Sequence, residues 1–126
     1  MKLDVGMYVR TDTGKIGKIV NTEKGIGSLL YVLDVDLPNY AHIKQEFIKA
    51  SHDIIDLIEV GDYVNGYKIS GVYDDDGVVN EYNLKHKKCL GKNIYDEDYQ
   101  EYLIYEEEIE NIVTKEQMEA MQYKVV

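Results

Sequence analysis

The sequence contains little of what links small proteins covalently or anchors them to a membrane. Its 126 residues include one cysteine, Cys89, one proline, one phenylalanine and no tryptophan. A single cysteine cannot form an internal disulfide, which indicates a reducing compartment such as the cytoplasm. No apolar run reaches the roughly 18 residues that a membrane-spanning helix needs, and the first residues, MKLDVG, lack the pattern of a signal peptide. We therefore expect a cytoplasmic protein without a membrane partner.

Positive charge is also scarce, and the shortage is uneven along the chain. The net charge is −10, with 24 acidic against 14 basic residues. Residues 1–59 carry nine acidic and seven basic residues, a net −2, whereas residues 60–126 carry fifteen and seven, a net −8. A negative field repels nucleic-acid phosphates and attracts basic surfaces. We therefore expect no direct nucleic-acid binding, and a protein with a basic surface as the partner of the second half.

Several short segments of the sequence occur twice. Three pairs share an offset of 55 residues: LDVGMYV at 3–9 with IEVGDYV at 58–64, QEFI at 45–48 with QEYL at 100–103, and DIIDLI at 53–58 with EIENIV at 108–113. A further pair, KIGKIV at 15–20 and KISGVY at 68–73, falls two or three residues short of that offset. Similarity at a fixed period predicts one supersecondary unit present twice.

Alternating apolar and polar residues predict β-strands in both copies. In the first copy we expect strands at MYVRT, IGKIV, SLLYVLDVD, HIKQEFIKA and DIIDLI, with a turn at Asp12–Lys15; HIKQEFIKA could also form a short helix. In the second copy we expect DYVNGYKISGVYD, GVVNEYNL, EYLIYEE and EIENIV, with a hairpin turn at Asp74–Gly77. Four glycines are expected where strands bend or approach closely: Gly6, Gly17, Gly61 and Gly71.

Two resemblances extend this interpretation. The segment DVGMYVRTDTGKIGKIV resembles the start of an SH3-like β-barrel of the KOW type, and IIDLIEVGDYVNGYKI and IENIVTKEQMEAMQYKV are similar to small uncharacterised proteins of clostridial phages and prophages. The resemblance implies a phage origin and a mainly β fold of two tandem SH3-like barrels, 1–57 and 58–113. It carries over no activity and no functional residue.

The remaining residues, 114–126, are expected to form a short tail. Thr114 and Gln117 have the spacing of a capping box and are followed by helix-forming residues. The final QYKVV is expected to be a short strand or a docking segment, and an exposed strand edge there would allow a homodimer.

Clustered acidic residues and tyrosines are the most distinctive polar feature of the second half. The candidate partner-binding residues are Asp74, Asp75, Asp76, Asp96, Glu97, Asp98, Tyr99, Tyr105, Glu106, Glu107 and Glu108. They predict either a negative surface that binds a basic partner or solvated turns and strand edges that keep the protein soluble. The basic segment KHKKC at 85–89 leaves a third alternative open, in which these acids are compensated within the same half.

No motif indicates catalysis, a metal or a cofactor. The acids of DDDG are consecutive rather than alternating as in a calcium loop, and His86 and Cys89 lack the second pair of ligands that zinc requires. EKGIGS at 23–28 lacks the Lys-Ser/Thr ending of a phosphate loop, so it is expected to connect two strands. We therefore do not expect an enzyme, and a small-ligand site remains the weakest alternative.

The preferred hypothesis is a phage-encoded, non-enzymatic binding protein acting in the host cytoplasm. It would inhibit a host defence or nucleic-acid-processing protein through its acidic surface, as anti-CRISPR proteins do. The alternative hypothesis is a KOW-like or SH3-like interaction module in transcription, translation or virion assembly. That module would use the less acidic first half, around Arg10, Lys15 and Lys18.

Overall fold

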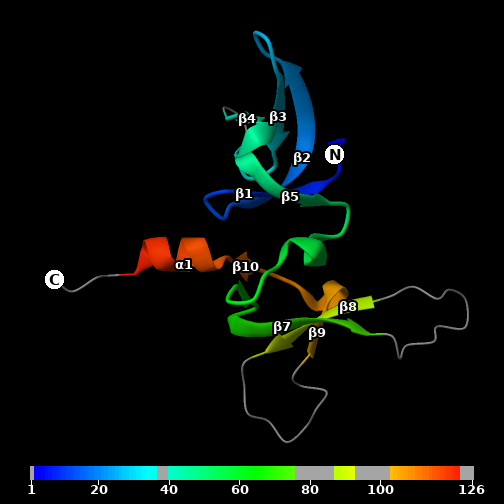
Figure 1. Cartoon of the computed structure of the whole chain (residues 1–126), viewed down its shortest axis with the longest axis vertical. Helices are drawn as coiled ribbons and strands as arrows, with labels where there is room; N and C mark the ends of the chain where they lie inside the picture. Colours follow the sequence, from blue (N-terminus) through cyan, green and yellow to red (C-terminus); the bar gives the residue numbers. More distant parts are fainter. Residues whose placement is uncertain (1, 37–39, 76–86, 93–102, 123–126) are drawn as a thin grey trace, which may run out of the picture. The chain divides into compact units, whose positions relative to one another are not determined.

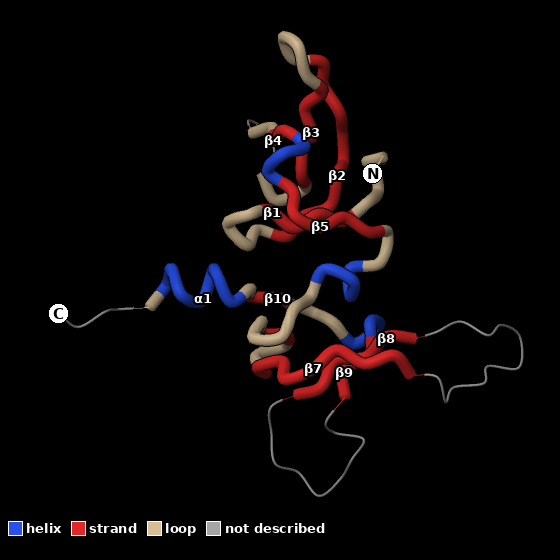
Figure 2. The backbone as a smooth tube through the Cα atoms, viewed as in Figure 1, coloured by secondary structure: helices blue, strands red, loops and turns tan. Residues whose placement is uncertain are grey.

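The computed structural model describes residues 2–36, 40–75, 87–92 and 103–122. The chain divides into two compact units, Met1–Leu57 and Ile58–Val126, and each is described by itself. The fold is mainly β: each unit contains one antiparallel five-stranded sheet that is not closed. Figure 2 shows the strands in red and the few short helical segments in blue.

In the first unit the strands follow the order β4-β3-β2-β1-β5 across the sheet (Figure 1). They are β1 (Tyr8–Thr11), β2 (Ile16–Lys24), β3 (Leu29–Leu33), β4 (His42–Ile43) and β5 (Phe47–Ser51). Two 3₁₀ helices, η1 (Lys44–Glu46) and η2 (Ile54–Leu57), precede and follow β5. The buried core consists of Met7, Val9, Ile19, Tyr31 and Leu33.

In the second unit the order is β9-β8-β7-β6-β10 (Figure 1). In both units, therefore, the fourth, third, second, first and fifth strands along the chain follow one another across the sheet. The strands are β6 (Tyr63–Val64), β7 (Tyr67–Asp75), β8 (Lys87–Lys92), β9 (Leu103–Tyr105) and β10 (Ile112–Val113). A 3₁₀ helix, η4 (Glu106–Glu108), precedes β10, and the helix α1 (Lys115–Met121) follows it. Among its described residues, Ile58, Val64, Ile69, Leu90 and Ile104 are buried aliphatic side chains.

The repeated motif forms the same turn in both units. The N–H of Met7 donates to the carbonyl of Asp4 at 3.1 Å, and the N–H of Asp62 donates to Glu59 at 3.1 Å. The glycine inside each turn is left-handed, with φ of 97° at Gly6 and 96° at Gly61. Other residues adopt that conformation at a cost, which explains why both copies have glycine there.

Each turn is tied to the second strand of its unit by a reciprocal pair of backbone hydrogen bonds. Gly6 N–H donates to the carbonyl of Ile19 at 2.8 Å, and Ile19 N–H donates back to Met7 at 2.8 Å. In the second unit Gly61 N–H donates to Ile69 at 2.9 Å, and Ile69 N–H donates back to Asp62 at 2.8 Å. The strand register shifts immediately after Ile19 and after Ile69. Such bulges bend a strand, so each long strand curves at the same place.

The constant offset of 55 residues holds only at this turn. Ile19 corresponds to Ile69, an offset of 50, and the cross-strand pair Tyr31–His42 corresponds to Leu90–Ile104, offsets of 59 and 62. The predicted equivalence of DIIDLI with EIENIV is therefore wrong, as is the shortfall of two or three residues for KIGKIV. Of QEYL at 100–103, matched with QEFI, all but Leu103 lies outside the described residues. The connections between strands differ in length, and surface loops accept such differences at little energetic cost.

The last strands confirm the larger offset. Glu46 accepts a hydrogen bond from Ile43 N–H at 2.8 Å just before β5, and Glu108 accepts one from Tyr105 N–H at 3.1 Å just before β10. Tyr8 then pairs with Ser51 in the first unit as Tyr63 pairs with Val113 in the second. HIKQEFIKA is thus two strands around one helical turn, rather than one strand or one helix.

Two other predicted elements differ from those in the structure. DIIDLI is the 3₁₀ helix η2 rather than a strand, because the Ser51 hydroxyl accepts from Asp53 N–H at 3.1 Å and donates to Asp56 at 2.6 Å, which closes a turn. The predicted hairpin turn at Asp74–Gly77 is wrong in its first half. Asp74 and Asp75 belong to β7. The predicted strand at 77–84 and the final QYKVV beyond Gln122 lie outside the described residues.

Three turns and connections were predicted correctly. Thr11 N–H donates to Lys15 at 2.8 Å and closes the turn at Asp12–Lys15, and residues 25–28 connect β2 to β3. The C-terminal helix starts at the expected capping box, in which Thr114 N–H donates to Gln117 Oε1 at 3.1 Å and Gln117 N–H donates to Thr114 Oγ1 at 3.3 Å.

Close approaches explain the other two glycines singled out from the sequence. A Cβ at Gly17 would lie 3.1 Å from the Cβ of Leu33. Gly71 and its cross-strand partner Gly91 lie under the ring of Tyr73, since a Cβ at Gly91 would be 2.7 Å from that ring. An aromatic ring over a glycine pair replaces the packing that the glycines themselves cannot supply.

Replacement of Asp62 by alanine tests the turn of the second unit. The Asp62 carboxylate is fully buried and accepts from Glu59 N–H at 2.7 Å and from Lys115 N–H at 2.9 Å. Buried donors that lose their acceptor cost about 1–3 kcal/mol each, so Asp62→Ala should lower the free energy of unfolding by about 2–4 kcal/mol in urea titrations. Asp62→Asn keeps one acceptor and should cost less. An Asp62→Ala protein as stable as the wild type would contradict this role.

Candidate functional site

The one predicted acidic cluster that the structure describes in full lies on η4. Glu107 and Glu108 are exposed and Glu106 is half-buried, and the exposed Glu110 follows on the same connection to β10. Glu108 has a structural task because its carboxylate binds Tyr105 N–H. The carboxylates of Glu107 and Glu110, in contrast, have no hydrogen bond or ion pair with any described residue.

Asn65 holds this acidic connection in place. Its Oδ1 accepts from Glu110 N–H at 2.8 Å and Asn111 N–H at 3.2 Å, and its Nδ2 donates to the Glu108 carbonyl at 2.7 Å. Asn65 has a positive φ of 52° and precedes Gly66, with a φ of 83°, in the tight turn between β6 and β7. Sequence analysis missed this residue, although the dipeptide Asn-Gly is a strong hairpin signal.

Part of the first acidic cluster is paired in strand register with part of the basic segment. Asp74 lies opposite Lys88, and Asp75 lies opposite Lys87, in the register of β7 and β8. Opposite charges at directly paired positions stabilise a sheet modestly. The register brings the two segments to paired positions, and local compensation of the acids at 74–75 stays a prediction.

The other predicted residues are divided between described and undescribed parts of the chain. Tyr105 is half-buried in β9, opposite the buried Cys89 of β8. Asp76, Asp96, Glu97, Asp98 and Tyr99 lie outside the described residues. Of the eleven candidates, the structure therefore groups Tyr105 with the glutamates of η4.

A cluster of charged and aromatic side chains in the first unit was not predicted. His42 Nε2 lies 2.6 Å from Asp36 Oδ2, and Lys15 Nζ donates to Asp36 Oδ1 at 2.8 Å. His42 Nδ1 lies 3.3 Å from Glu46 Oε2 without hydrogen-bond geometry. The Tyr40 ring stands edge-on to the imidazole, 4.6 Å between centroids. His42 alone in the sequence carried no signal, because the cluster is assembled from three connections, before β2, before β4 and before β5.

The electrostatics of the cluster favour an ionised Asp36. Burial alone would raise the pKa of this carboxyl, but hydrogen bonds from Lys15 and His42, with the Lys15 charge, outweigh burial and lower the pKa below its ordinary value of 3.8. The Lys15 ammonium binds one oxygen of the Asp36 carboxylate. Among the described residues, no three His, Cys, Asp or Glu side chains are grouped so that they could hold a metal ion. Through Asp36 the cluster connects the turn before β2, the segment after β3 and the strand β4.

The basic residues expected to form a surface in the first unit have different environments. Arg10 is fully buried, and its Nη1 donates to the Leu57 carbonyl at 3.0 Å, so the expectation that it forms part of a binding surface is wrong. Lys15 is paired with Asp36. Lys18 is exposed, and its ammonium lies over the Tyr8 ring at 5.6 Å from the centroid.

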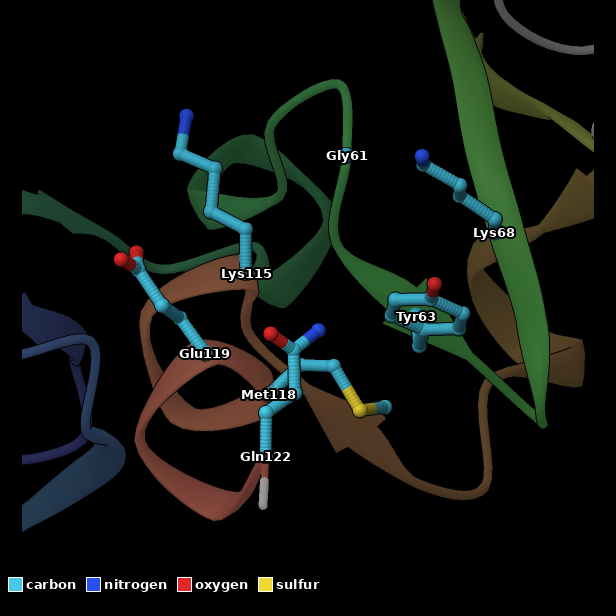
Figure 3. Close-up of a pocket in the computed structure, with 7 residues that line it drawn as sticks. All are labelled: Gly61, Tyr63, Lys68, Lys115, Met118, Glu119 and Gln122. Carbon is cyan, nitrogen blue, oxygen red and sulfur yellow. The ribbon is translucent and has the colours of Figure 1, made fainter. Parts of the chain in front are cut away.

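A cavity of about 390 Å³ lies in the second unit between the β6–β7 hairpin and α1 (Figure 3). It is lined by Gly61, Tyr63, Lys68, Lys115, Met118, Glu119 and Gln122. It contains none of the residues predicted to bind a partner. No sequence signal indicated it, because its walls come from segments about 50 residues apart.

Comparison with known proteins returned no match: no family model, no curated protein and no solved structure resembles the chain. In the part of the chain that is described, no helix is long and apolar enough to cross a membrane.

Replacement of Asp36 by asparagine tests the His42 cluster. Loss of hydrogen bonds to a charged acceptor should lower the free energy of unfolding by about 1–3 kcal/mol near neutral pH. Because folding lowers the pKa of Asp36, its stabilisation is fully present above the unfolded pKa of about 3.8 and is lost as the pH falls through the lowered value. The difference between wild type and Asp36→Asn should therefore shrink in acid.

Urea unfolding of both proteins at neutral pH and in acid measures this difference. Asp53→Asn, at an exposed position of the same unit, is the matched control and should change little. A stability difference independent of pH would contradict the proposed ionisation of Asp36.

Proposed function

We propose that the chain is a non-enzymatic binding protein built from two SH3-like units, and that the second unit binds a partner protein with a basic surface. The SH3-like assignment is supported by the shared order of five antiparallel strands and by a 3₁₀ helix before the fifth strand of each unit. Small sheets of this kind present loops and strand ends to partners. On this proposal, binding of the partner requires no metal and no cofactor.

The observation that carries the proposal is the pair of uncompensated carboxylates of Glu107 and Glu110. Both are exposed, and Asn65 fixes the backbone on which they stand through three hydrogen bonds. A preorganised charged surface binds with less loss of conformational freedom than a flexible one. The net charge of −8 over residues 60–126 adds long-range attraction for a basic partner.

The partner class follows from the same charge. Proteins that bind nucleic acid present extended basic surfaces, and an acidic protein competes with phosphates for them. We therefore assign the chain to inhibitors of a host defence or nucleic-acid-processing protein, acting in the host cytoplasm in the manner of an anti-CRISPR protein. The phage origin rests on the sequence resemblance.

A second candidate function is an SH3-like interaction module in transcription, translation or virion assembly. The pair of the half-buried Tyr8 and the exposed Lys18 in the first unit favours it, because an aromatic ring with a cation is a common contact in interfaces. With Arg10 buried, this surface is smaller than the sequence indicated.

Charge reversal distinguishes the two candidates. Wild-type chain recovers a host protein from nuclease-treated lysate, and the affinity for that purified protein is then measured by calorimetry at low and moderate salt. Glu107→Lys with Glu110→Lys should weaken binding about tenfold or more, with the larger effect at low salt. Asp96→Lys, Glu97→Lys and Asp98→Lys together should weaken it as well.

The matched control carries the same change of charge in the first unit, Glu23→Lys with Asp53→Lys, at two exposed positions. It should bind nearly as wild type. Equal weakening by the control, or unchanged binding by the Glu107/Glu110 variant, would contradict the acidic-surface proposal. Selective loss with Tyr8→Ala and Lys18→Glu would favour the second candidate.

A further inference from the structure

The turn between β6 and β7 contains the one Asn-Gly dipeptide of the sequence, Asn65–Gly66. It is a two-residue loop, because Val64 and Tyr67 are paired on either side of it. Both loop residues have a positive φ, 52° at Asn65 and 83° at Gly66, as in the tightest hairpin turns. Gly66 is exposed, and a Cβ there would meet no atom within 4 Å beyond its chain neighbours. The backbone nitrogen of Gly66 is therefore sterically unhindered.

An asparagine followed by glycine can react with its own main chain. The backbone nitrogen of Gly66 attacks Cγ of the Asn65 side-chain amide and forms a bond to it. The Cγ–Nδ2 bond breaks, and ammonia leaves with the proton that the backbone nitrogen gives up. The product is a succinimide ring, which water opens at either carbonyl to leave aspartate or isoaspartate. Glycine favours the attack, because it carries no side chain beside the nitrogen.

The turn has to open before this ring can close. A hairpin turn of this type holds the Gly66 nitrogen away from Cγ of Asn65, so the main chain must first rotate between the two residues. Local opening requires little, because β6 and its partner β10 contain only two residues each. The Gly66 N–H donates no hydrogen bond to any described residue, so the rotation breaks none at the attacking nitrogen.

The reaction removes a contact that holds the acidic connection to the turn. Asn65 Nδ2 donates to the Glu108 carbonyl at 2.7 Å, whereas a carboxylate has no hydrogen to donate and repels that oxygen. Isoaspartate also adds one carbon to the main chain of the loop, which disrupts the pairing of Val64 with Tyr67. Both products therefore weaken the attachment of the acidic connection, and isoaspartate weakens it more.

We propose that Asn65–Gly66 is a self-modification site, at which succinimide formation and hydrolysis irreversibly release the connection that carries Glu107 and Glu110. Water is the co-reactant, and ammonia is the product that leaves. The chemistry depends on the dipeptide and its turn alone. Its consequence for partner binding rests on the proposed function: a released connection is less preorganised, so binding by the acidic surface declines as the protein ages.

Ageing of the full chain tests the modification. The folded protein is incubated at mildly alkaline pH, digested and analysed by mass spectrometry, and isoaspartate is labelled with an isoaspartyl methyltransferase. Residue 65 should gain the mass of deamidation and become labelled. Asn21, which is exposed but followed by the β-branched Thr22, is the internal control and should stay unmodified over the same time. The unfolded peptide of residues 61–69 should react faster than the chain, because it needs no opening.

Hydrogen exchange then measures the release. The modified fraction carries an additional negative charge and is separated by anion exchange. In that fraction the N–H groups of Glu110 and Asn111, which donate to Asn65 Oδ1, should exchange faster than in fresh protein. The N–H groups of Gly6 and Ile19, in the matched turn of the first unit, should be unchanged. Asn65→Asp reproduces the aspartate product and should show a smaller effect than isoaspartate, because it keeps the acceptor.

Two results would overturn the modification site: an Asn65 that reacts no faster than Asn21 in the folded chain, or unchanged exchange of Glu110 and Asn111 in the modified fraction. Both are measured without a partner, so they are independent of the Glu107/Glu110 reversal. If that reversal weakens partner binding, the modified fraction should bind more weakly than fresh protein, and equal binding would contradict the regulatory consequence. If the reversal has no effect, the acidic-surface proposal and that consequence fail, whereas mass and exchange still decide the modification.

Discussion

The structure depends on one backbone arrangement, in which a left-handed glycine ties the start of each unit to its second strand. Gly6 and Gly61 can adopt the required φ, and the reciprocal hydrogen bonds with Ile19 and Ile69 follow from it. These bonds set which residue of the long strand is buried, and the strand bulges immediately afterwards. Because a slip of one residue would turn every side chain to the opposite face, this one contact sets the register of the whole sheet.

One of the two differences inside that turn distinguishes how the units continue. At the position after the glycine, the first unit has Met7, whose sulfur accepts Asp4 N–H at 3.3 Å, and the second has Asp62, whose carboxylate accepts Glu59 N–H. The second carboxylate oxygen then accepts Lys115 N–H, and α1 starts there. Methionine offers no second acceptor. The aspartate therefore attaches the start of α1 to the repeated turn of the second unit.

Charge is distributed in the second unit according to what lies opposite each acid. In strand register Asp74 and Asp75 pair with Lys88 and Lys87, whereas the carboxylates of Glu107 and Glu110 have no hydrogen bond or ion pair with any described residue. An uncompensated charge on a fixed backbone attracts a partner more effectively than a compensated one. The acidic composition could be read from the sequence. Which acids lie opposite a basic residue could not, because the sequence left compensation by KHKKC open and strand pairing fixes the register.

By itself the sequence determined the local features: the mainly β character, the turn at Asp12–Lys15, the glycine turns and the capping box at Thr114. Each depends on the conformational preferences of neighbouring residues, which act over a few positions. Tertiary structure alone decided the equivalence of Ser51 with Val113, the burial of Arg10, the His42 cluster and the cavity at Met118. These features bring together segments that are separated by loops of unequal length. Because the entropic cost of closing a loop changes slowly with its length, many loop lengths are tolerated, and the local sequence does not indicate which distant residues will be in contact.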